Sequence, residues 1–375
     1  MFQPAARMNM PVEKMRRTNS IELKIENEKK RSISFRQKWM LFLLSYMLVM
    51  AFIVRKSRVL WLNQHLSTIE SLDLSNTGTS TLSTAIFLHV GYFNLWPDML
   101  TCARNAVQGT KQHGGTDKVD IFVSVTNANP PSSSYQAGKL QSPKFDISKI
   151  EKDLQTLPFI GNILVKEFDN SGADIGPFMK MLAHEDIAYR KYDVVLKMHS
   201  KGDNVWRDHT IQSLCGSPEQ VSSILNSFEA NHDVDMIAPK GTIFGPRTDP
   251  SRVFSHLVQK YNMIEAPSAT FDPKTQSIMN DVHNLLFPEW IKNHDDWKKI
   301  REDDMVVVAG TMFWARYSAL YPRNWVDIIS KLKFTKGHKE NLGIEHAIER
   351  LFATEILLRK RKIAGISPPT HSLGE

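Results

Sequence analysis

Residues 192–203 read YDVVLKMHSKGD, a short apolar run that ends abruptly in charged and polar residues. The run Asp193–Met198 has the length and β-branched content of a buried strand. The same pattern surrounds it, in expected strands at Asn162–Phe168 and Asp235–Ala238 and expected helices at Ile175–Tyr189 and Pro218–Ala230. Strands that alternate with helices of ten or more residues predict βαβ units. We therefore expect an α/β fold with a mostly parallel sheet flanked by helices.

Further elements extend this pattern in both directions along the chain. Apolar runs predict strands at Ala85–Val90, Val119–Val125 and Met305–Phe313, the last followed by a bend at Trp314–Arg316. Apolar residues at helical spacing predict helices at Trp96–Val107 and Gly343–Lys360. The stretch from Gly241 to Asp304 is less regular and rich in Trp, His and Pro. We interpret it as an insertion that closes over a site or contacts an acceptor.

The positive charge of the chain is confined to one end. The 375 residues carry a formal net charge of +7, but residues 1–58 alone carry +9 and the remainder −2. A nucleic-acid groove needs its basic residues on the folded domain. We therefore expect no nucleic-acid partner.

An uncharged run of sixteen residues, WMLFLLSYMLVMAFIV, lies at residues 39–54. As a helix it would span about 24 Å, somewhat less than a bilayer core of ~30 Å. A cleaved signal peptide fits poorly, because Arg55, Lys56 and Arg58 occupy the place of a small-residue cleavage site. We predict a transmembrane signal-anchor. Ten Lys and Arg residues precede it and three follow closely, which favours a cytosolic N-terminus and a type II topology.

These features give an expected domain organisation. Residues 1–38 form a basic cytosolic tail, 39–54 the signal-anchor, 55–83 a stem, 84–367 the catalytic domain and 368–375 a C-terminal tail. The topology would place the domain in the lumen of the Golgi apparatus or the endoplasmic reticulum. Cys102 and Cys215 are the two cysteines, 113 positions apart. Two buried free thiols are the favoured interpretation, with one structural disulfide in an oxidising lumen as the alternative.

The first candidate motif is NSGADIGPF at Asn170–Phe178, where a strand passes into a helix. Ligands collect at the carboxyl ends of strands in such sheets, and glycines allow close approach of the backbone. The structural alternative is a turn in which Asp174 caps the following helix. On the residues alone this alternative is favoured.

The second motif is the strand end itself, where Lys197, His199 and Lys201 alternate with other residues. Alternation would place all three on one side of the strand, where they could receive a diphosphate. Trp206 and Arg207 follow, and a guanidinium suits bidentate anion recognition. The alternative is a strand end whose polar groups merely reach solvent.

The remaining motifs are weaker. AGTMFWAR at Ala309–Arg316 ends in aromatic residues, for which core packing is the default and a sugar or base platform the functional alternative. Glu345 and His346 open the last helix, where acidic residues are usually dipole partners. A metal site at His294–Asp296 competes with an ordinary surface turn.

Together NSGADIGPF, YDVVLKMHSK with Trp206-Arg207, AGTMFWAR and EHAIERLF (Glu345–Phe352) resemble, in order, the rhamnan synthesis protein F family of glycosyltransferases. The resemblance runs from about Ala85 to Phe352. It implies a GT-A-like nucleotide-diphospho-sugar transferase fold and transfer of a sugar, rhamnose or another hexose, from a nucleotide-sugar donor to a glycan acceptor. Two departures stand out, Ala173 in place of Arg and Gly202-Asp203 in place of Lys-Ser.

The resemblance also implies roles for single residues. Asn170, Gly172 and Asp174 would hold the nucleotide or donor sugar, and the diphosphate would fall to Lys197, His199, Lys201 and Arg207. The wider inverting GT-A enzymes have an Asp-x-Asp metal site where this chain has Lys197-Met198-His199. We therefore expect no obligatory metal, with a divalent ion as the open alternative. His346, ahead of Glu345, is the expected catalytic base. The rival hypothesis is a non-catalytic carbohydrate-binding or scaffolding relative.

Overall fold

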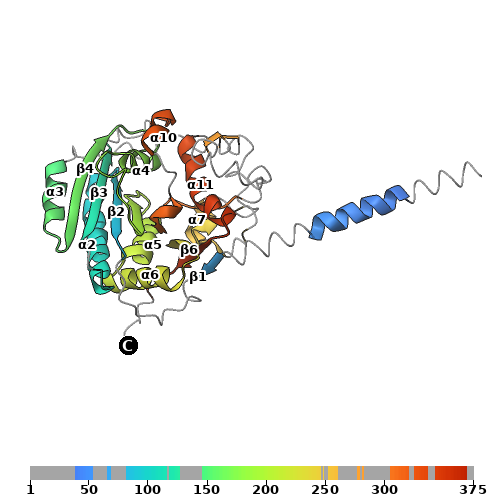
Figure 1. Ribbon diagram of the computed structural model, residues 1–375, viewed down its shortest axis with the longest axis horizontal. Helices are drawn as coiled ribbons and strands as arrows, with labels where there is room; N and C mark the ends of the chain where they lie inside the picture. The colour runs from blue at the N-terminus through green and yellow to red at the C-terminus, as the bar shows by residue number, and fades with distance from the viewer. Residues whose placement is uncertain are drawn as a thin grey trace, which may run out of the picture. The chain divides into compact units, whose positions relative to one another are not determined.

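The structure is a computed structural model whose described residues fall in several ranges. They are 39–53, 66–68, 82–115, 118–126, 146–245, 248, 252–260, 277–278, 281–282, 305–320, 325–336 and 343–369. The chain divides into two compact units, Met1–Trp61 and Leu62–Glu375 (Figure 1). Most of the expected insertion, including His294–Asp296, lies outside the described residues.

The first unit contains a helix over residues 39–53, where the signal-anchor was expected. Its large apolar side chains are exposed, from Trp39 at 51% to Leu48 at 68%. None of the helices in the described ranges combines the length and the apolar character that a membrane crossing requires. The signal-anchor stays a prediction.

The second unit is built on an eight-stranded sheet in the order β1-β10-β6-β9-β5-β2-β3-β4. Adjacent strands run parallel, except that β9 is antiparallel to both β5 and β6. The strands are β1 Leu66–Thr68, β2 Thr84–Val90, β3 Val119–Thr126, β4 Ile160–Phe168, β5 Val194–His199, β6 Val234–Pro239, β9 Phe313–Arg316 and β10 Lys362–Ile366. A separate antiparallel pair joins β7 (Ile243–Phe244) to β8 (Val307–Val308). The expected α/β fold with a mostly parallel sheet is confirmed.

Helices cover both faces of this sheet (Figure 1). Successive residues of β9 mark the two faces, because Phe313 packs on Phe352 whereas the indole of Trp314 donates to the carbonyl of Leu214. One layer contains α2 (Trp96–Gln112), α3 (Ile147–Gln155), α5 (Asn204–Cys215) and α6 (Pro218–Ala230). The other contains α4 (Ile175–Leu182), α10 (Trp325–Lys331) and α11 (Ile344–Leu358). The short α7 (Ser255–Lys260) contacts α5.

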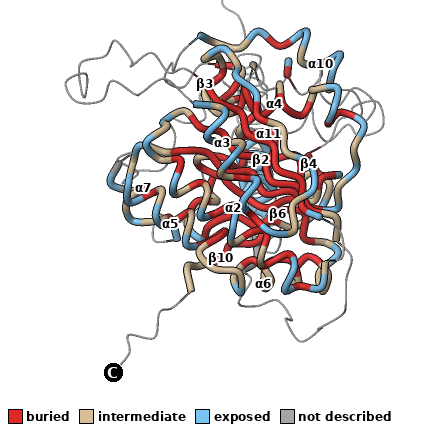
Figure 2. The backbone as a smooth tube through the Cα atoms, turned by 90° about the vertical axis from the view of Figure 1, so that its left-hand side faces the viewer, coloured by how far each residue is buried: buried red, intermediate tan, exposed pale blue. Residues whose placement is uncertain are grey.

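The core lies between these layers, and the central strands are buried along their whole length (Figure 2). Burial on both faces explains why these strands read as continuous apolar runs in the sequence. Phe313 and Trp314 are fully buried, so the packing interpretation of these aromatic residues is confirmed.

Several expected boundaries are corrected by the structure. The single strand expected at Met305–Phe313 is two short strands, β8 and β9, separated by a turn, and Trp314–Arg316 is strand rather than bend. The helix expected to reach Tyr189 ends at Leu182. Strand β10 was not expected, and β1 within the predicted stem pairs with it. The residues expected to form a stem therefore contribute a strand to the sheet.

The two cysteines form a disulfide, with an S–S distance of 1.95 Å, between α2 and the end of α5. The prediction of two free thiols was wrong. Both residues are fully buried, as expected, but the packing of α2 against α5 brings their Cα atoms to 5.1 Å. This separation is in the range that a disulfide requires.

Candidate functional site

The candidate site lies where the parallel strands end. His89 is the last residue but one of β2, and His199 is the last residue of β5. The two residues lie directly opposite each other in the parallel pairing of these strands. The turn that precedes β9 lies at the same edge, because β9 runs in the opposite direction. The carboxyl edge of a parallel sheet is the usual place for ligands in α/β folds.

A buried ion pair occupies the centre of this edge. Lys197 on β5 is 1% exposed, and its Nζ atom lies 2.6 Å from Oδ2 of Asp174. Nζ also donates to the carbonyl and the hydroxyl oxygen of Thr311, at 2.9 and 3.0 Å. The Thr311 hydroxyl in turn donates to the same Asp174 oxygen at 2.7 Å. Three predicted motifs therefore meet in one closed set of charge-assisted hydrogen bonds.

The electrostatics of Asp174 follow from this arrangement. Burial alone would raise the pKa of its carboxyl group, but the charges of His199 and Lys197 and the hydrogen bonds from Lys197 and Thr311 hold the pKa well below its usual range. Since His199 is itself neutral near pH 7, Lys197 is the charge that acts at that pH. Asp174 is therefore an anion whose charge is already balanced by an internal cation.

The loop that presents Asp174 has an unusual backbone. Gly172 and Ala173 both have positive φ, at 78° and 49°. The amide of Gly172 donates to the carbonyl of Thr335 at 2.8 Å, and Phe334 occupies the space that a Cβ atom would need. Asp174 stands at the N-cap position of α4 but makes no capping bond with its side chain. The helix-capping interpretation of Asp174 is therefore wrong, because the carboxylate is turned toward Lys197.

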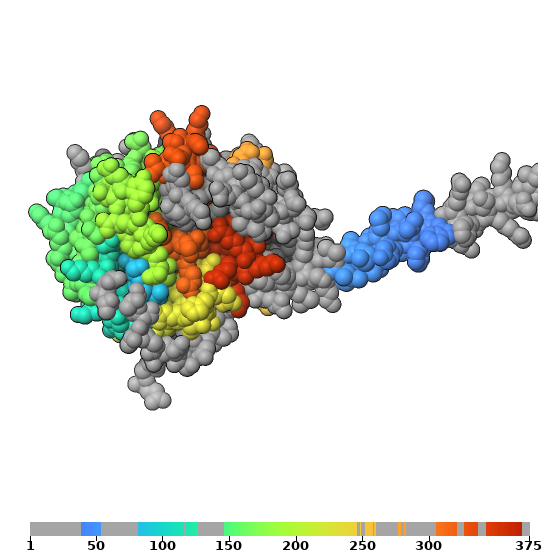
Figure 3. Space-filling view, in the orientation of Figure 1, coloured from blue at the N-terminus to red at the C-terminus, as the bar shows by residue number. Residues whose placement is uncertain are grey.

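The turn before β9 connects the strand ends to helix α11. The carbonyl of Gly310 accepts a hydrogen bond from Nε2 of His199 at 2.8 Å, and its amide donates to Oε1 of Glu349 at 3.1 Å. Gly310 and Thr311 have φ of 79° and 49°, so this turn is held in a left-handed conformation. In the space-filling view, orange and red segments from the C-terminal part of the chain meet yellow-green segments from its middle on this face (Figure 3).

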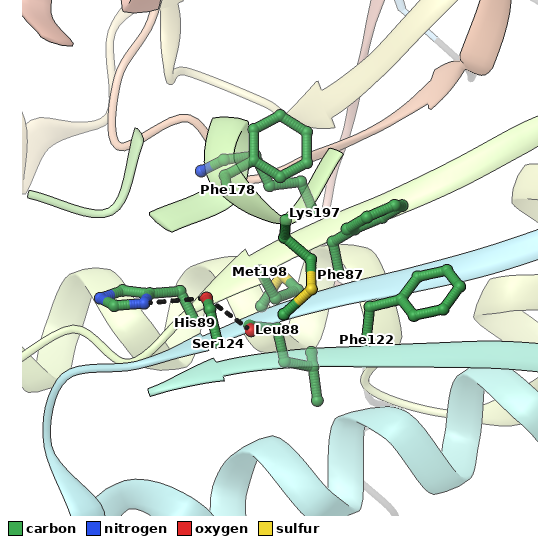
Figure 4. Close-up of a pocket in the computed structure, with 9 residues that line it drawn as sticks. Phe87, Leu88, His89, Phe122, Ser124, Phe178, Lys197 and Met198 are labelled. Atoms are coloured by element: carbon green, nitrogen blue, oxygen red, sulfur yellow. Dashed lines mark hydrogen bonds between the residues drawn. The ribbon is translucent and has the colours of Figure 1, made fainter. Parts of the chain in front are cut away.

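The two histidines of the edge are neutral near pH 7. Burial lowers the pKa of His199 to about 4 and that of His89 to about 3. Nδ1 of His89 lies 3.1 Å from the hydroxyl of Ser124, which donates its own hydrogen to the carbonyl of Leu88 (Figure 4). A hydroxyl has one hydrogen to give, so His89 must donate from Nδ1 and keep Nε2 as an acceptor. His89 was missed by the sequence analysis, although its place at the strand end is a usable signal.

The pocket in Figure 4, between β2, β5 and α4, is lined by Phe87, Phe178 and Lys197 among others. Its volume of about 10 Å³ is enough for about one water molecule. The ammonium group of Lys197 also lies 5.3 Å from the centre of the Phe178 ring. The interior side of the ion pair is therefore closed, and a substrate would have to approach from the rim of the edge.

The other expected diphosphate ligands lie near the edge but are already engaged. Lys201 follows the end of β5, and its Nζ atom lies 3.7 Å from the centre of the Trp206 ring. Arg207 on α5 pairs with Asp98 at 3.1 Å and donates to the carbonyl of Lys201 at 3.0 Å. Lys197 and His199 lie on one side of β5, as expected, because both contact the Gly310–Thr311 turn. The charge of Lys201 also acts on His199 and helps to lower its pKa. Asn170 lies at the start of the Asp174 loop and is half-buried.

Glu345 and His346 begin α11. Glu345 is 3% exposed, and no described residue forms a hydrogen bond with its Oε2 atom. Oε1 of Glu345 lies 4.0 Å from Nδ1 of His346. Glu349 is one turn further along the same face of the helix and contacts Gly310. The two expected catalytic residues are therefore about one helical turn from the ion-pair network.

The carboxylate of the ion-pair network is already engaged by protein groups. In the described part of the chain, no three His, Cys, Asp or Glu side chains are grouped so that they could hold one. Asp174 is the carboxylate of the network, and its Oδ2 atom already accepts from an ammonium group and a hydroxyl. A lysine within 3 Å of a carboxylate takes the place that a cation would need.

Comparison of the chain with models of known protein families gives a match. The model of the family described as rhamnan synthesis protein F matches residues 144–357, more than half of the chain. The chain belongs to the rhamnan synthesis protein F family. All four motifs lie inside the matched region, and the rhamnan synthesis protein F resemblance expected from them is confirmed.

Two relatives of this family member come from Xanthomonas campestris. The uncharacterized protein WxcX of one strain is 27% identical over 198 residues, and that of a second strain is 26% identical over the same length. In each case the match covers 50% of this chain and 23% of the relative, so it spans about a quarter of the relatives' length.

A solved structure, core-mannan synthase A from Aspergillus fumigatus in its Mn/GDP form, is also similar. It is 9% identical and covers 78% of this chain and 73% of its own. The TM-score is 0.29, which is too low to carry an argument about fold or function.

Proposed function

We propose that this chain is a glycosyltransferase that moves rhamnose or another hexose from a nucleotide-sugar donor to a glycan acceptor. The observation that carries the proposal is the convergence of four distant motifs at one edge. Asp174, Lys197, Thr311 and Glu349, one from each motif, are joined through the Gly310–Thr311 turn at the carboxyl edge of the sheet. Membership of the rhamnan synthesis protein F family supports a reaction of this class.

The donor would bind along this edge in a GT-A-like manner. Asn170 and Gly172 lie in the left-handed loop, where the backbone can approach a ligand closely. His89 adds an imidazole that accepts at Nε2. The ion pair between Asp174 and Lys197 would act mainly by holding this loop against β5.

We propose a smaller set of cationic ligands for the diphosphate than the sequence suggested. The charge of Lys197 is balanced by Asp174, and His199 is neutral near pH 7. A cation-lined diphosphate site would therefore depend on Lys201 and Arg207, at the rim of the edge. Binding of the diphosphate would compete with the contact between Arg207 and Asp98, whose carboxylate is exposed.

For the transfer step we propose His346 as the general base, with Glu345 beside it. The base would take the proton of an acceptor hydroxyl while that oxygen bonds to the anomeric carbon. The bond from the anomeric carbon to the diphosphate oxygen breaks, and the nucleoside diphosphate leaves with the bonding electrons. A carboxylate 4.0 Å from Nδ1 would stabilise the imidazolium that forms. The step as proposed uses no metal ion.

We place the domain in an oxidising compartment of the secretory pathway, the Golgi apparatus or the endoplasmic reticulum. The disulfide between Cys102 and Cys215 supports this proposal, because such bonds persist mainly in oxidising compartments. Attachment of the chain to a membrane through residues 39–54 stays a prediction.

The test is release of nucleotide from a panel of nucleotide sugars by the purified chain, with and without acceptor glycans. We expect one donor to be turned over, with excess chelator leaving the rate unchanged. His346→Ala and Glu345→Ala should lower kcat while donor affinity is kept. Glycan affinity with no release from any donor would contradict the proposal and favour the non-catalytic carbohydrate-binding alternative.

A further inference from the structure

A second pocket lies at the opposite edge of the sheet, where the parallel strands begin. It has a volume of about 290 Å³ and is open to solvent. Its walls come from residues that open β2, β3 and β5, among them Lys118, Asp120 and Tyr192. With about 3.3 Å per residue, strands of this length put it about 20 Å from the candidate site.

The floor of this pocket is a carboxylate whose hydrogen-bonding capacity is filled. Oδ1 of Asp120 accepts from the amide and the side chain of Asn162, at 2.6 and 3.0 Å. Oδ2 accepts from Nη1 of Arg190 at 2.9 Å and from the hydroxyl of Tyr192 at 2.8 Å. Gly161 has no side chain beneath this group, where a Cβ atom would lie 2.2 Å from Oδ1. Asp120 therefore serves to fix Arg190 and Tyr192.

The remaining charges of the pocket are positive. Lys118 and Lys191 are exposed lining residues, and neither forms an ion pair with any residue in the described ranges. The nearby carboxylate of Asp193 already accepts two hydrogen bonds from Ser83, both of 2.8 Å. Arg190 balances Asp120, so Lys118 and Lys191 leave two positive charges among the residues that line this open pocket.

We infer that this pocket binds an oxyanion carried by a glycan chain, a carboxylate, sulfate or phosphate group, with Lys118 and Lys191 as its ligands. The ammonium groups of two lysines are point charges on flexible side chains. They can follow anionic groups of varied position better than one planar guanidinium group can. Arg190 retains N–H groups beyond the two that contact Asp120 and the carbonyl of Asp186. Tyr189, 86% exposed, adds an aromatic ring next to Arg190 in the chain.

The choice of a glycan as the carrier rests on the proposed function, whereas the oxyanion site itself does not. A site about 20 Å from the transfer edge would hold part of an extended acceptor and leave the reacting end free. Such a site would raise the local concentration of anionic acceptors without taking part in the chemistry.

The test compares two double variants of the full chain. Lys118→Gln/Lys191→Gln removes the two pocket charges, and Lys152→Gln/Lys166→Gln removes two exposed lysines from α3 and β4. Calorimetric titration would use three probes, a heparin-derived hexasaccharide, neutral maltohexaose and sodium sulfate alone. We expect wild type and the control variant to bind the hexasaccharide equally, and the pocket variant about tenfold more weakly, the factor that about 1.4 kcal/mol produces.

Sodium sulfate should compete with the hexasaccharide in the wild type, and maltohexaose should not. Equal weakening of both variants, or hexasaccharide binding that the pocket variant keeps, would overturn the inference. Tighter binding of sulfate than of the hexasaccharide would keep the oxyanion site and overturn its assignment to a glycan. Nucleotide release is measured in parallel, so a failed transferase proposal with intact hexasaccharide binding is told apart from a failed site.

Discussion

The ammonium group of Lys197 lies 2.6 Å from the carboxylate of Asp174, although the two residues are 23 positions apart and belong to different motifs. Both groups also contact Thr311, which comes more than a hundred residues later. The contact balances the charge of Lys197 within the edge. It also joins the Asp174 loop, β5 and the turn before β9 into one unit.

Lys197→Met should destabilise the fold strongly. It would leave the Asp174 carboxylate without its cation, and breaking a buried pair costs about 3–5 kcal/mol. The double variant Asp174→Asn/Lys197→Met should lose less, because no unpaired charge remains. Guanidinium denaturation of the wild type, the single variants Lys197→Met and Asp174→Asn, and the double variant measures the free energy of unfolding. Additive losses in the double variant would show that the two groups do not interact.

Stability should fall as the pH decreases from about 6.5 toward 4. The pKa values of His199 and His89 are lowered to about 4 and about 3 in the folded protein, so both stay neutral there while the unfolded chain takes up protons. The unfolded state then binds more protons, and each histidine contributes a slope of about 1.4 kcal/mol per pH unit within its window. The folded state has the full stabilisation from these two histidines above pH 6.5, the pKa of histidine in the unfolded chain.

Denaturation at pH 7.0, 6.0 and 5.0 measures this slope. His199→Asn should reduce the slope by about 1.4 kcal/mol per pH unit, the contribution of one proton. The control is His232→Asn, which removes an exposed histidine outside the candidate site. A slope that is the same in all three proteins would mean that His199 takes up its proton at the same pH in the folded and the unfolded state.

Much of the fold could be predicted because it depends on local patterns. Helix α6 was expected at its observed bounds, and the apolar runs of β2, β3 and β5 were recognised to within one residue. Alternation along β5 correctly put Lys197 and His199 on one side. For Lys201 it stays a prediction, because β5 ends at His199 and alternation applies only within the strand.

The rest depends on contacts that no local pattern contains. Asp174 looks like a helix cap in sequence, and only the position of Lys197 on β5 diverts its carboxylate. Thr311 adopts a φ of 49°, a conformation that a β-branched residue rarely takes, so the turn inside an apolar run was read as strand. The disulfide joins residues 113 positions apart and is decided by the packing of two helices.

Gly172→Ala should weaken both the fold and donor binding. The residue has a φ of 78°, and a Cβ atom would lie 2.5 Å from the Phe334 ring and 2.9 Å from Gly176. Strain of this kind costs about 1–3 kcal/mol and would displace the Asp174 loop. Thermal unfolding and the KM for the donor are the measurements. Gly202→Ala is the control for stability, because its Cβ atom would meet nothing closer than 3.8 Å. Equal melting temperatures in both variants would contradict the strain argument.

Glu349→Ala should slow nucleotide release, although we assign Glu349 no contact with substrate. Its Oε1 atom accepts from the amide of Gly310, whose carbonyl holds His199. Loss of a hydrogen bond to a charged group costs about 1.5–3 kcal/mol, and the left-handed turn would relax. Glu349→Gln keeps an acceptor oxygen and should restore most of kcat. If glutamine is as damaging as alanine, the negative charge rather than the hydrogen bond is what the turn requires.

Cys102→Ala/Cys215→Ala should lower the free energy of unfolding by about 2–4 kcal/mol, since the bond closes a long loop in the unfolded chain. Reductant should destabilise the wild type and leave the double variant unchanged, which separates the bond from the lost packing of two buried side chains. The measurement is urea denaturation with and without reductant, together with the intact mass after thiol alkylation under non-reducing conditions. Alkylation of both cysteines in the denatured, unreduced protein would mean that the bond does not form and would remove the structural support for an oxidising compartment.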